Sequence, residues 1–294
     1  MEKERVSAQT QESEQTDPNS EEEEVRARER VPRPLAVIVG AASGIGMEIA
    51  SALVQKGYAV VNISRNLCCV ERVKNITADI TQGEELERAI KAAGEEGGRI
   101  AFLIYSAGTS MAAPIESSRE ADIRYLFEVN YFGAVRALRS VLPYMKEKGG
   151  RVLFISSLGS LYPIPFDSFY SSSKAALDML ARGARVELKR YKISLTCVEA
   201  GGTSTSFTFK RKVYPEEANG AYAKDVQKSV AALANMEQGG MEPKEVAREI
   251  VDELFRKYPS ITFVPGTKNK VFRAMYRLLP EKWTAYFNDK RYNQ

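Results

Sequence analysis

The sequence predicts an α/β fold in a single domain, with one parallel β-sheet covered by helices on both faces. Three observations predict it. From Leu35 onward, short runs rich in β-branched residues alternate with longer stretches of helical periodicity. A glycine-rich turn, beginning at Gly40, follows the first of these runs directly. The 294 residues, 44% of them hydrophobic and 27% charged, suit one α/β domain of about 250 residues with additions at its ends.

The strand and helix signals follow one another in a regular order. The apolar runs that predict strands stand at residues 35–39, 58–63, 76–78, 99–105, 151–155, 193–198 and 260–264. The amphipathic stretches that predict helices stand between them, at residues 44–56, 84–93, 123–148, 169–191 and 243–257. A strand, a helix and a second strand in this order form a crossover between parallel strands. The result is a doubly wound sheet, which binds ligands at the carboxyl ends of its strands.

Both ends of the chain depart from this pattern. Residues 1–34 hold ten acidic and six basic residues and almost no large apolar side chains, so burial cannot offset the entropy of ordering them. We expect a disordered acidic tail there, a catalytic domain over residues 35–265 and a basic aromatic extension over residues 266–294. Three roles are open for the extension: contact with a membrane surface, a cover for the pocket, or contact with a partner subunit.

Composition excludes several classes of chemistry. The chain holds no histidine, which rules out Ser-His-Asp and Cys-His nucleophilic systems and His-ligated metal sites. Its three cysteines, Cys68, Cys69 and Cys197, are too few for a disulfide framework and lack the spacing of a zinc site. No apolar run approaches the roughly 20 residues that span a bilayer. We therefore expect a soluble cytoplasmic protein without a metal ion and without a nucleic-acid partner.

The turn after the first strand has the form of a phosphate-binding loop. It reads GAASGIG over residues 40–46 and opens a helix. Glycines let the backbone come close to a diphosphate, and the helix N-terminus offers unpaired N–H groups and a partial positive charge. A tight turn without a ligand is the alternative. The position of the turn between the first strand and the first helix favours a Rossmann-type dinucleotide site. The expected cofactor contacts are Gly40, Ser43, Gly44, Ile45 and Gly46.

The end of the second strand indicates which dinucleotide binds. A carboxylate at this position accepts a hydrogen bond from the ribose 2′-hydroxyl of NAD, whereas a basic residue accommodates the 2′-phosphate of NADP. Residues 62–66 hold Arg65 and no carboxylate. A guanidinium can pair with two phosphate oxygens at once. We therefore expect NADP(H) in preference to NAD(H), the alternative being that Arg65 is an ordinary surface residue.

Further motifs occur in a fixed order. Ala107-Gly108 follows the fourth strand, Ser157 follows the fifth, and Tyr170 and Lys174 stand four residues apart in the next helix. With the glycine turn, these motifs resemble the short-chain dehydrogenase/reductase family over most of residues 35–265. The resemblance implies a doubly wound fold and the transfer of hydride between a nicotinamide cofactor and a ketone or secondary alcohol.

The resemblance also assigns roles to individual residues. It implies that Tyr170 exchanges a proton with the substrate oxygen and that Ser157 hydrogen-bonds the substrate carbonyl. Lys174 also holds the nicotinamide ribose, and Asn130 helps to hold a water relay to that lysine. Residues four apart on a helix share a face, so the Lys174 ammonium should lower the pKa of the Tyr170 phenol. The further cofactor contacts that the resemblance implies are Asp79, Ile80, Ser106, Ala107, Gly108 and Thr203.

The region over residues 202–241 lacks a strong strand signal, and the family places its substrate lid there. It offers aromatic side chains for an apolar substrate such as a steroid or lipid, and the basic run Lys210-Arg211-Lys212 for an anionic carrier. Within the enzyme class, a steroid or lipid dehydrogenase and an acyl-thioester ketoreductase are both open. We expect a homodimer or homotetramer that acts on a small carbonyl or alcohol compound. A different hypothesis is a catalytically silent NADP(H)-sensing or scaffold protein of the same fold.

Overall fold

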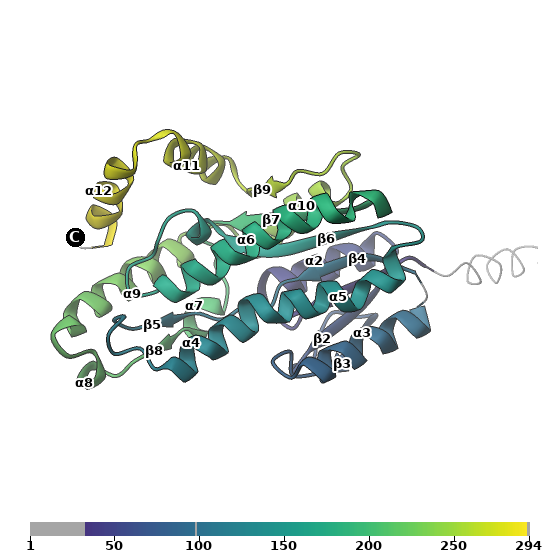
Figure 1. The fold of residues 1–294 in the computed structure, drawn as a ribbon, viewed down its shortest axis with the longest axis horizontal. Coiled ribbons are helices and arrows are strands. Elements are labelled where there is room, and N and C mark those ends of the chain that lie inside the picture. Colours follow the sequence, from purple (N-terminus) through teal and green to yellow (C-terminus); the bar gives the residue numbers. More distant parts are fainter. Residues whose placement is uncertain (1–32, 98, 293–294) are drawn as a thin grey trace, which may run out of the picture. The chain divides into compact units, whose positions relative to one another are not determined.

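A seven-stranded parallel sheet organises the protein. The computed structural model describes residues 33–97 and 99–292. The strand order is β3-β2-β1-β4-β6-β7-β9, and these neighbours pair in parallel (Figure 1). The strands are β1 (Leu35–Val39), β2 (Ala59–Ser64), β3 (Val73–Thr77), β4 (Ile100–Tyr105), β6 (Gly150–Ser157), β7 (Ile193–Ala200) and β9 (Thr262–Phe263). The chain runs outward in both directions from β1, so the sheet is doubly wound, as predicted.

Helices cover the sheet on both faces (Figure 1). The first face carries α2 (Gly44–Gln55) and α10 (Pro243–Leu254), and the second carries α3 (Gly83–Gly97), α5 (Gly133–Met145) and α6 (Ser168–Leu188). Side chains of β1 alternate between the two cores: Ile38 lies in the first, and Val37 and Val39 lie in the second. Because both faces are buried, the central strands consist of continuous apolar runs, which made them predictable.

All predicted elements except β1 differ from the structure by a few residues at one end or both, and the structure explains two of these differences. Strand β3 begins at Val73, three residues before the predicted start, because it is a partly exposed edge strand with little apolar pattern. The helix predicted over residues 123–148 is not continuous: α4 (Glu120–Phe127) passes through a π-helical turn at Glu128–Phe132 into α5. Such turns within helices are frequent at functional sites. This one contains Asn130, whose side chain is fully buried.

The lid region over residues 202–241 consists of short elements and one longer helix. Its elements are α7 (Phe207–Lys210), β8 (Lys212–Val213), α8 (Glu216–Asn219) and α9 (Ala223–Gln238). Strand β8 pairs in parallel with β5 (Met111–Ala112) and so joins the lid to the segment after β4. Short 3₁₀ turns stand at Leu158–Ser160, Lys189–Tyr191 and Gly220–Tyr222.

Two helices end the described part of the chain. In α11 (Thr267–Leu278), the rings of Phe272 and Tyr276 pack on Tyr162, with centroids 5.1 and 5.5 Å away. Helix α12 (Glu281–Tyr292) packs against α9. Among the described residues, no helix combines the length and the apolar character needed to cross a membrane. The acidic tail expected over residues 1–34 lies outside the described residues, except for Arg33 and Pro34.

Candidate active site

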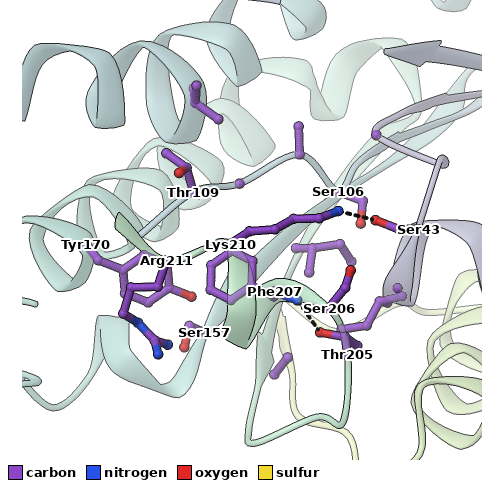
Figure 2. A pocket seen from close by; sticks show the side chains of 18 of the residues that line it. Ser43, Ser106, Thr109, Ser157, Tyr170, Thr205, Ser206, Phe207, Lys210 and Arg211 are labelled. Atoms are coloured by element: carbon purple, nitrogen blue, oxygen red, sulfur yellow. Dashed lines mark hydrogen bonds between the residues drawn. The ribbon is translucent and has the colours of Figure 1, made fainter. Parts of the chain in front are cut away.

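A cavity of about 610 Å³ opens at the carboxyl ends of the central strands (Figure 2). It includes the turns that follow β1 and β4, between which the strand order reverses, and this is where doubly wound sheets bind ligands. Gly46 and Asn130 are buried behind the lining of the cavity. The other predicted site residues line it: Gly40, Ser43, Gly44, Ile45, Arg65, Asp79, Ile80, Ser106, Ala107, Gly108, Ser157, Tyr170, Lys174 and Thr203.

The glycine turn has the geometry that an anion needs. Gly40 has a φ of +93°, and a Cβ added at Gly46 would lie 2.4 Å from the Gly40 carbonyl oxygen. At the start of α2, the Ser43 side chain makes no capping hydrogen bond, and the described first turn holds no acidic residue. The first N–H groups of α2 and the positive end of its dipole are therefore available to a phosphate. These residues fit the diphosphate of a nicotinamide dinucleotide.

Asn62, a buried residue of β2, holds the two loops that flank this site. Its Oδ1 accepts a hydrogen bond from the Ala41 N–H at 2.9 Å, and its Nδ2 donates to the Asn66 carbonyl at 3.1 Å. The glycine turn and the loop that carries Arg65 are thereby fixed to one strand. Asn62 was not predicted from the sequence, although an amide within an otherwise apolar strand is a recognisable signal of a buried polar role.

Arg65 and Asp79 line the cavity where β2 and β3 end. Arg65 is exposed, directly after β2. The Asp79 carboxylate accepts hydrogen bonds from the N–H and hydroxyl of Thr81, at 2.9 and 2.8 Å. Although burial acts to raise the pKa of Asp79, these bonds and the Arg65 charge lower it. An exposed cation therefore stands at the strand end that distinguishes the two dinucleotides.

Tyr170, Lys174 and Ser157 come together from two elements, α6 and the end of β6. The Ser157 hydroxyl shares a hydrogen bond with the Tyr170 phenol, and Lys174 Nζ lies 5.7 Å from the centroid of the Tyr170 ring. Figure 2 shows the Tyr170 and Ser157 side chains in the same pocket. The Ser156 hydroxyl donates instead to the Lys174 carbonyl, at 3.4 Å. Ser157 is therefore the serine that stands beside the tyrosine.

Burial dominates the ionisation of this pair. It raises the pKa of the Tyr170 phenol well above its ordinary value, although the hydrogen bond with Ser157 acts in the opposite direction. The net shift of this pKa is therefore upward and not downward as expected, because the loss of hydration is the largest effect on the phenol. Burial also lowers the pKa of Lys174 to about 8, while its Nζ donates to the Ile155 carbonyl at 2.9 Å. At pH 7 the site combines a neutral phenol with an ammonium group.

Asn130 ties α6 to the loop after β4. Its Oδ1 accepts from the Thr109 N–H at 2.8 Å, and its Nδ2 donates to the Thr109 carbonyl and the Ser173 hydroxyl, both at 2.9 Å. Ser173 in turn donates to the Tyr170 carbonyl at 2.7 Å. The amide thus fixes the backbone of the turn that carries Tyr170. The water relay to Lys174 stays a prediction.

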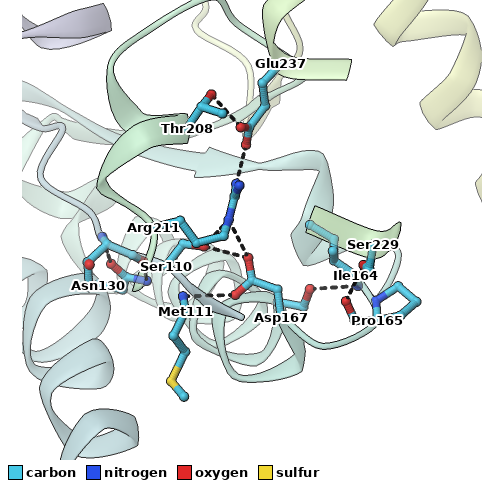
Figure 3. A network of polar contacts seen from close by, with 12 residues as sticks. Ser110, Met111, Asn130, Ile164, Pro165, Asp167, Thr208, Arg211, Ser229 and Glu237 are labelled. Atoms are coloured by element: carbon cyan, nitrogen blue, oxygen red, sulfur yellow. Dashed lines mark hydrogen bonds and ion pairs between the residues drawn. The ribbon is translucent and has the colours of Figure 1, made fainter. Parts of the chain in front are cut away.

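A buried network of charged groups, not predicted from the sequence, lies beside this site (Figure 3). The Arg211 side chain is 2% exposed, and its Nη2 lies 2.6 Å from the Glu237 carboxylate. Its Nε lies 2.9 Å from the Ser110 hydroxyl and 3.6 Å from the Asp167 carboxylate. Ser110 donates to Asp167 at 2.6 Å. Burial raises the pKa of Asp167 to about 6, although the bond from Ser110 and the Arg211 charge act against this.

The basic run at residues 210–212 therefore does not form one surface patch. Lys210 Nζ lies 3.3 Å from the Ser43 hydroxyl, at the glycine turn (Figure 2). Arg211 turns inward, and Lys212 pairs on the outside with Asp122 at 2.5 Å. The three side chains thus have different partners, although all three residues line the cavity.

Comparisons with known proteins agree with this geometry. The family model described as short chain dehydrogenase matches residues 34–214. The chain is 29% identical to a 3-ketodihydrosphingosine reductase of Bacteroides thetaiotaomicron, over 86% of this chain and 95% of that protein. It is 26% identical to the NADPH-dependent 1-acyldihydroxyacetone phosphate reductase of Saccharomyces cerevisiae, over 85% of this chain and 88% of that protein.

A solved structure supports the same conclusion. The short-chain dehydrogenase of Streptomyces avermitilis superposes with a TM-score of 0.73 at 29% identity, covering 83% of this chain and 93% of that one. The doubly wound sheet, the glycine turn and the Tyr170-Lys174 pair occur together with a family match over residues 34–214. The chain belongs to the short-chain dehydrogenase/reductase family.

Proposed function

We propose that this protein is an NADP(H)-dependent oxidoreductase that interconverts apolar ketones and secondary alcohols. The observation that carries the proposal is the presence of Tyr170, Ser157 and Lys174 in the cavity that also contains the phosphate-binding turn. When bound, the nicotinamide group supplies or accepts the hydride. The residues of this chain bind and orient the substrate and transfer the proton.

The chain's own residues act on the carbonyl oxygen. The buried phenol of Tyr170 holds its proton at neutral pH and donates it to that oxygen as negative charge develops there. The Ser157 hydroxyl, beside the phenol, donates a second hydrogen bond to the same oxygen. The Lys174 ammonium then favours the phenolate that is left. The Phe207 ring of the lid, 6.0 Å from the Tyr170 ring, limits the access of water.

The cofactor preference rests on Arg65. Its guanidinium lines the cavity after β2, and one relative is named as NADPH-dependent. The test compares kcat/KM for NADPH and NADH in the wild type and in Arg65→Gln. The wild type should prefer NADPH, and losing one charge-assisted phosphate contact should reduce that preference about tenfold or more. Arg88→Gln, which changes an exposed arginine of α3, is the control and should keep the preference for NADPH. A wild-type preference for NADH would remove the role of Arg65.

The lining of the cavity supports a lipid-like substrate. Leu233, Met236, Tyr162, Ile164 and Phe207 contribute apolar surface. Two relatives are named for ketone compounds of lipids, ketodihydrosphingosine and acyldihydroxyacetone phosphate. The test is NADPH consumption with long-chain ketones, 3-oxoacyl thioesters, ketosteroids and sugars. Turnover of the apolar ketones supports the proposal. Failure with every compound, together with tight NADPH binding, favours the silent NADP(H)-sensing alternative.

We also propose that α11 and α12 lie on the surface of an anionic membrane. Residues 267–290 hold six basic and two acidic side chains. The exposed large apolar side chains of the two helices are Val271, Met275, Leu278, Trp283, Tyr286 and Phe287. Exposed apolar groups among basic residues are the composition of helices that lie in a lipid interface. A lipid-like substrate would be taken up at that surface.

A further inference from the structure

The Arg211 guanidinium has one donor group without a partner. Its Nε and Nη2 are bonded to Ser110 and Glu237, but Nη1 is buried and has no hydrogen-bond partner among the described residues. Buried polar atoms in proteins almost always have a partner, so an exception of this kind calls for an explanation. Leaving a buried donor unsatisfied is unfavourable, and for a charged group more so.

The position of Arg211 suggests what completes it. Arg211 lines the same cavity as Tyr170 and Ser157, and its charge acts directly on the Tyr170 phenol. Figure 2 shows the guanidinium on the side of the pocket that holds the Tyr170 and Ser157 hydroxyls. The substrate carbonyl must reach those hydroxyls to be reduced. Substrate atoms next to that carbonyl therefore lie near the Arg211 guanidinium.

The charges around Arg211 restrict the chemistry of that atom. One guanidinium faces two carboxylates, Asp167 and Glu237, and Asp167 stands three residues before Tyr170 in the sequence (Figure 3). A phosphate or carboxylate bonded to Nη1 would add a third negative charge next to the two carboxylates that already face this guanidinium, in a poorly hydrated place, which is unfavourable. A neutral oxygen accepts the hydrogen bond from Nη1 without adding charge.

We infer that Arg211 Nη1 donates a hydrogen bond to a neutral oxygen of the substrate, a few bonds from the carbonyl that is reduced. The inference rests on the proposed reductase function and narrows its substrate class. The favoured substrates are apolar ketones with a nearby hydroxyl, ester or thioester oxygen. Ketones without a second oxygen near the carbonyl leave Nη1 unpaired. Ketones with an anionic group near the carbonyl are repelled by the Asp167 and Glu237 carboxylates.

The test uses three substrates of matched chain length with NADPH and the full-length protein. The first, 3-dodecanone, has no oxygen near its carbonyl. The second, 1-hydroxy-3-dodecanone, has a neutral hydroxyl there, and the third, 3-oxododecanoate, has an anionic carboxylate. The wild type should show a kcat/KM about tenfold or more higher for the hydroxyketone than for either other compound, the size expected for one hydrogen bond from a charged donor. Equal kcat/KM values for 3-dodecanone and the hydroxyketone would overturn the inference.

Two variants separate this role from a structural one. Arg211→Lys keeps a positive charge between the carboxylates but lacks Nη1, so the preference for the hydroxyketone should fall to about twofold or less while 3-dodecanone is still reduced. Thr208→Val removes the 2.6 Å bond to Glu237 at the far end of the network and should keep the preference. The ratio of the kcat/KM values for two substrates does not depend on the fraction of folded enzyme.

The possible outcomes also distinguish this inference from the proposed function. An Arg211→Lys enzyme that keeps the full preference contradicts the inference, as does a wild type that prefers 3-oxododecanoate. If Arg211→Lys does not fold, the wild-type comparison still decides through its three kcat/KM values. If the wild type reduces no ketone at all, the proposed function fails before Arg211 is tested.

Discussion

At the scale of single residues, Tyr170 and Lys174 are both buried, and burial favours the neutral form of each. The phenol is held neutral, whereas the pKa of the lysine falls only to about 8. At pH 7 the pair therefore has a proton to give and an ammonium to stabilise the phenolate that results. This arrangement suits a protein that donates a proton to a developing alkoxide, which is the direction of ketone reduction.

Replacing Tyr170 by Phe tests the proton-donor role directly. Turnover should fall by about 10²–10⁴-fold, the usual contribution of general acid catalysis, whereas the dissociation constant of NADPH should change little. The measurements are steady-state NADPH oxidation and NADPH fluorescence titration. Tyr258→Phe, an exposed tyrosine outside this cavity, serves as the control with unchanged turnover. A Tyr170→Phe enzyme with more than half of the wild-type activity would remove Tyr170 from the mechanism.

Replacing Lys174 by Met tests the cost of burying its ammonium. The pKa of Lys174 falls from 10.5 to about 8 because of burial, so the ammonium lowers stability at pH 7 by up to about 3 kcal/mol. Lys174→Met should therefore raise the free energy of unfolding while it abolishes activity. Between pH 8 and 10.5 the unfolded wild type binds more protons than the folded one. Wild-type stability therefore rises with pH over this range, and the advantage of the variant shrinks.

Urea unfolding at pH 7 and pH 10 measures this difference. Lys189→Met, at an exposed lysine beyond the end of α6, provides a control in which stability changes little at either pH. A Lys174→Met protein that is less stable than the wild type at pH 7 would show that the bond from Nζ to the Ile155 carbonyl outweighs the desolvation of the charge.

At the scale of elements, the sequence was most informative where the structure follows a local pattern. β1 was predicted with the bounds that it has, because all five of its residues are buried and apolar. The glycine turn and the Tyr170-Lys174 spacing depend on short-range geometry and could also be seen. The inward turn of Arg211 could not, because its partners Asp167 and Glu237 lie 44 and 26 residues away. Contacts of this kind are set by the packing of the lid on the sheet.

Gly46 in α2 tests how closely this helix approaches the glycine turn, and Gly183 in α6 serves as the comparison. In Gly46→Ala, the new Cβ would lie 2.4 Å from a backbone oxygen and 2.9 Å from the Ser106 hydroxyl, so stability should fall by about 1–3 kcal/mol and NADPH binding should weaken. In Gly183→Ala, no such contact lies within 4 Å, and stability should rise by about 0.5–1 kcal/mol. Thermal unfolding measures both. Equal midpoints for the two variants would contradict the close approach.

At the scale of the whole molecule, the cavity lies between the carboxyl ends of the strands and the lid, and α11 contacts its lining through Tyr162. Tyr162, which lines the cavity, packs on the rings of Phe272 and Tyr276 from the inner side of α11. On the outer side of the same helix, Leu278 is 84% exposed. Tyr162 and α11 thus lie between the pocket and the surface that we propose to lie on lipid. Capture of an apolar ketone from a membrane would then require little transfer through water.

Changing that outer surface tests the proposal. The double substitution Leu278→Glu and Phe287→Glu places two negative charges where α11 and α12 should meet anionic lipid. Binding to vesicles of phosphatidylcholine and phosphatidylglycerol should weaken by at least about tenfold, because both apolar contact and charge attraction are lost. Co-sedimentation measures the bound fraction. Tyr258→Glu, at an exposed aromatic residue elsewhere, should bind like the wild type, and salt should weaken the binding of both. If the wild type and the double variant sediment equally, the membrane proposal fails. A change in the oligomeric mass of the double variant alone would indicate that the surface contacts a partner subunit instead.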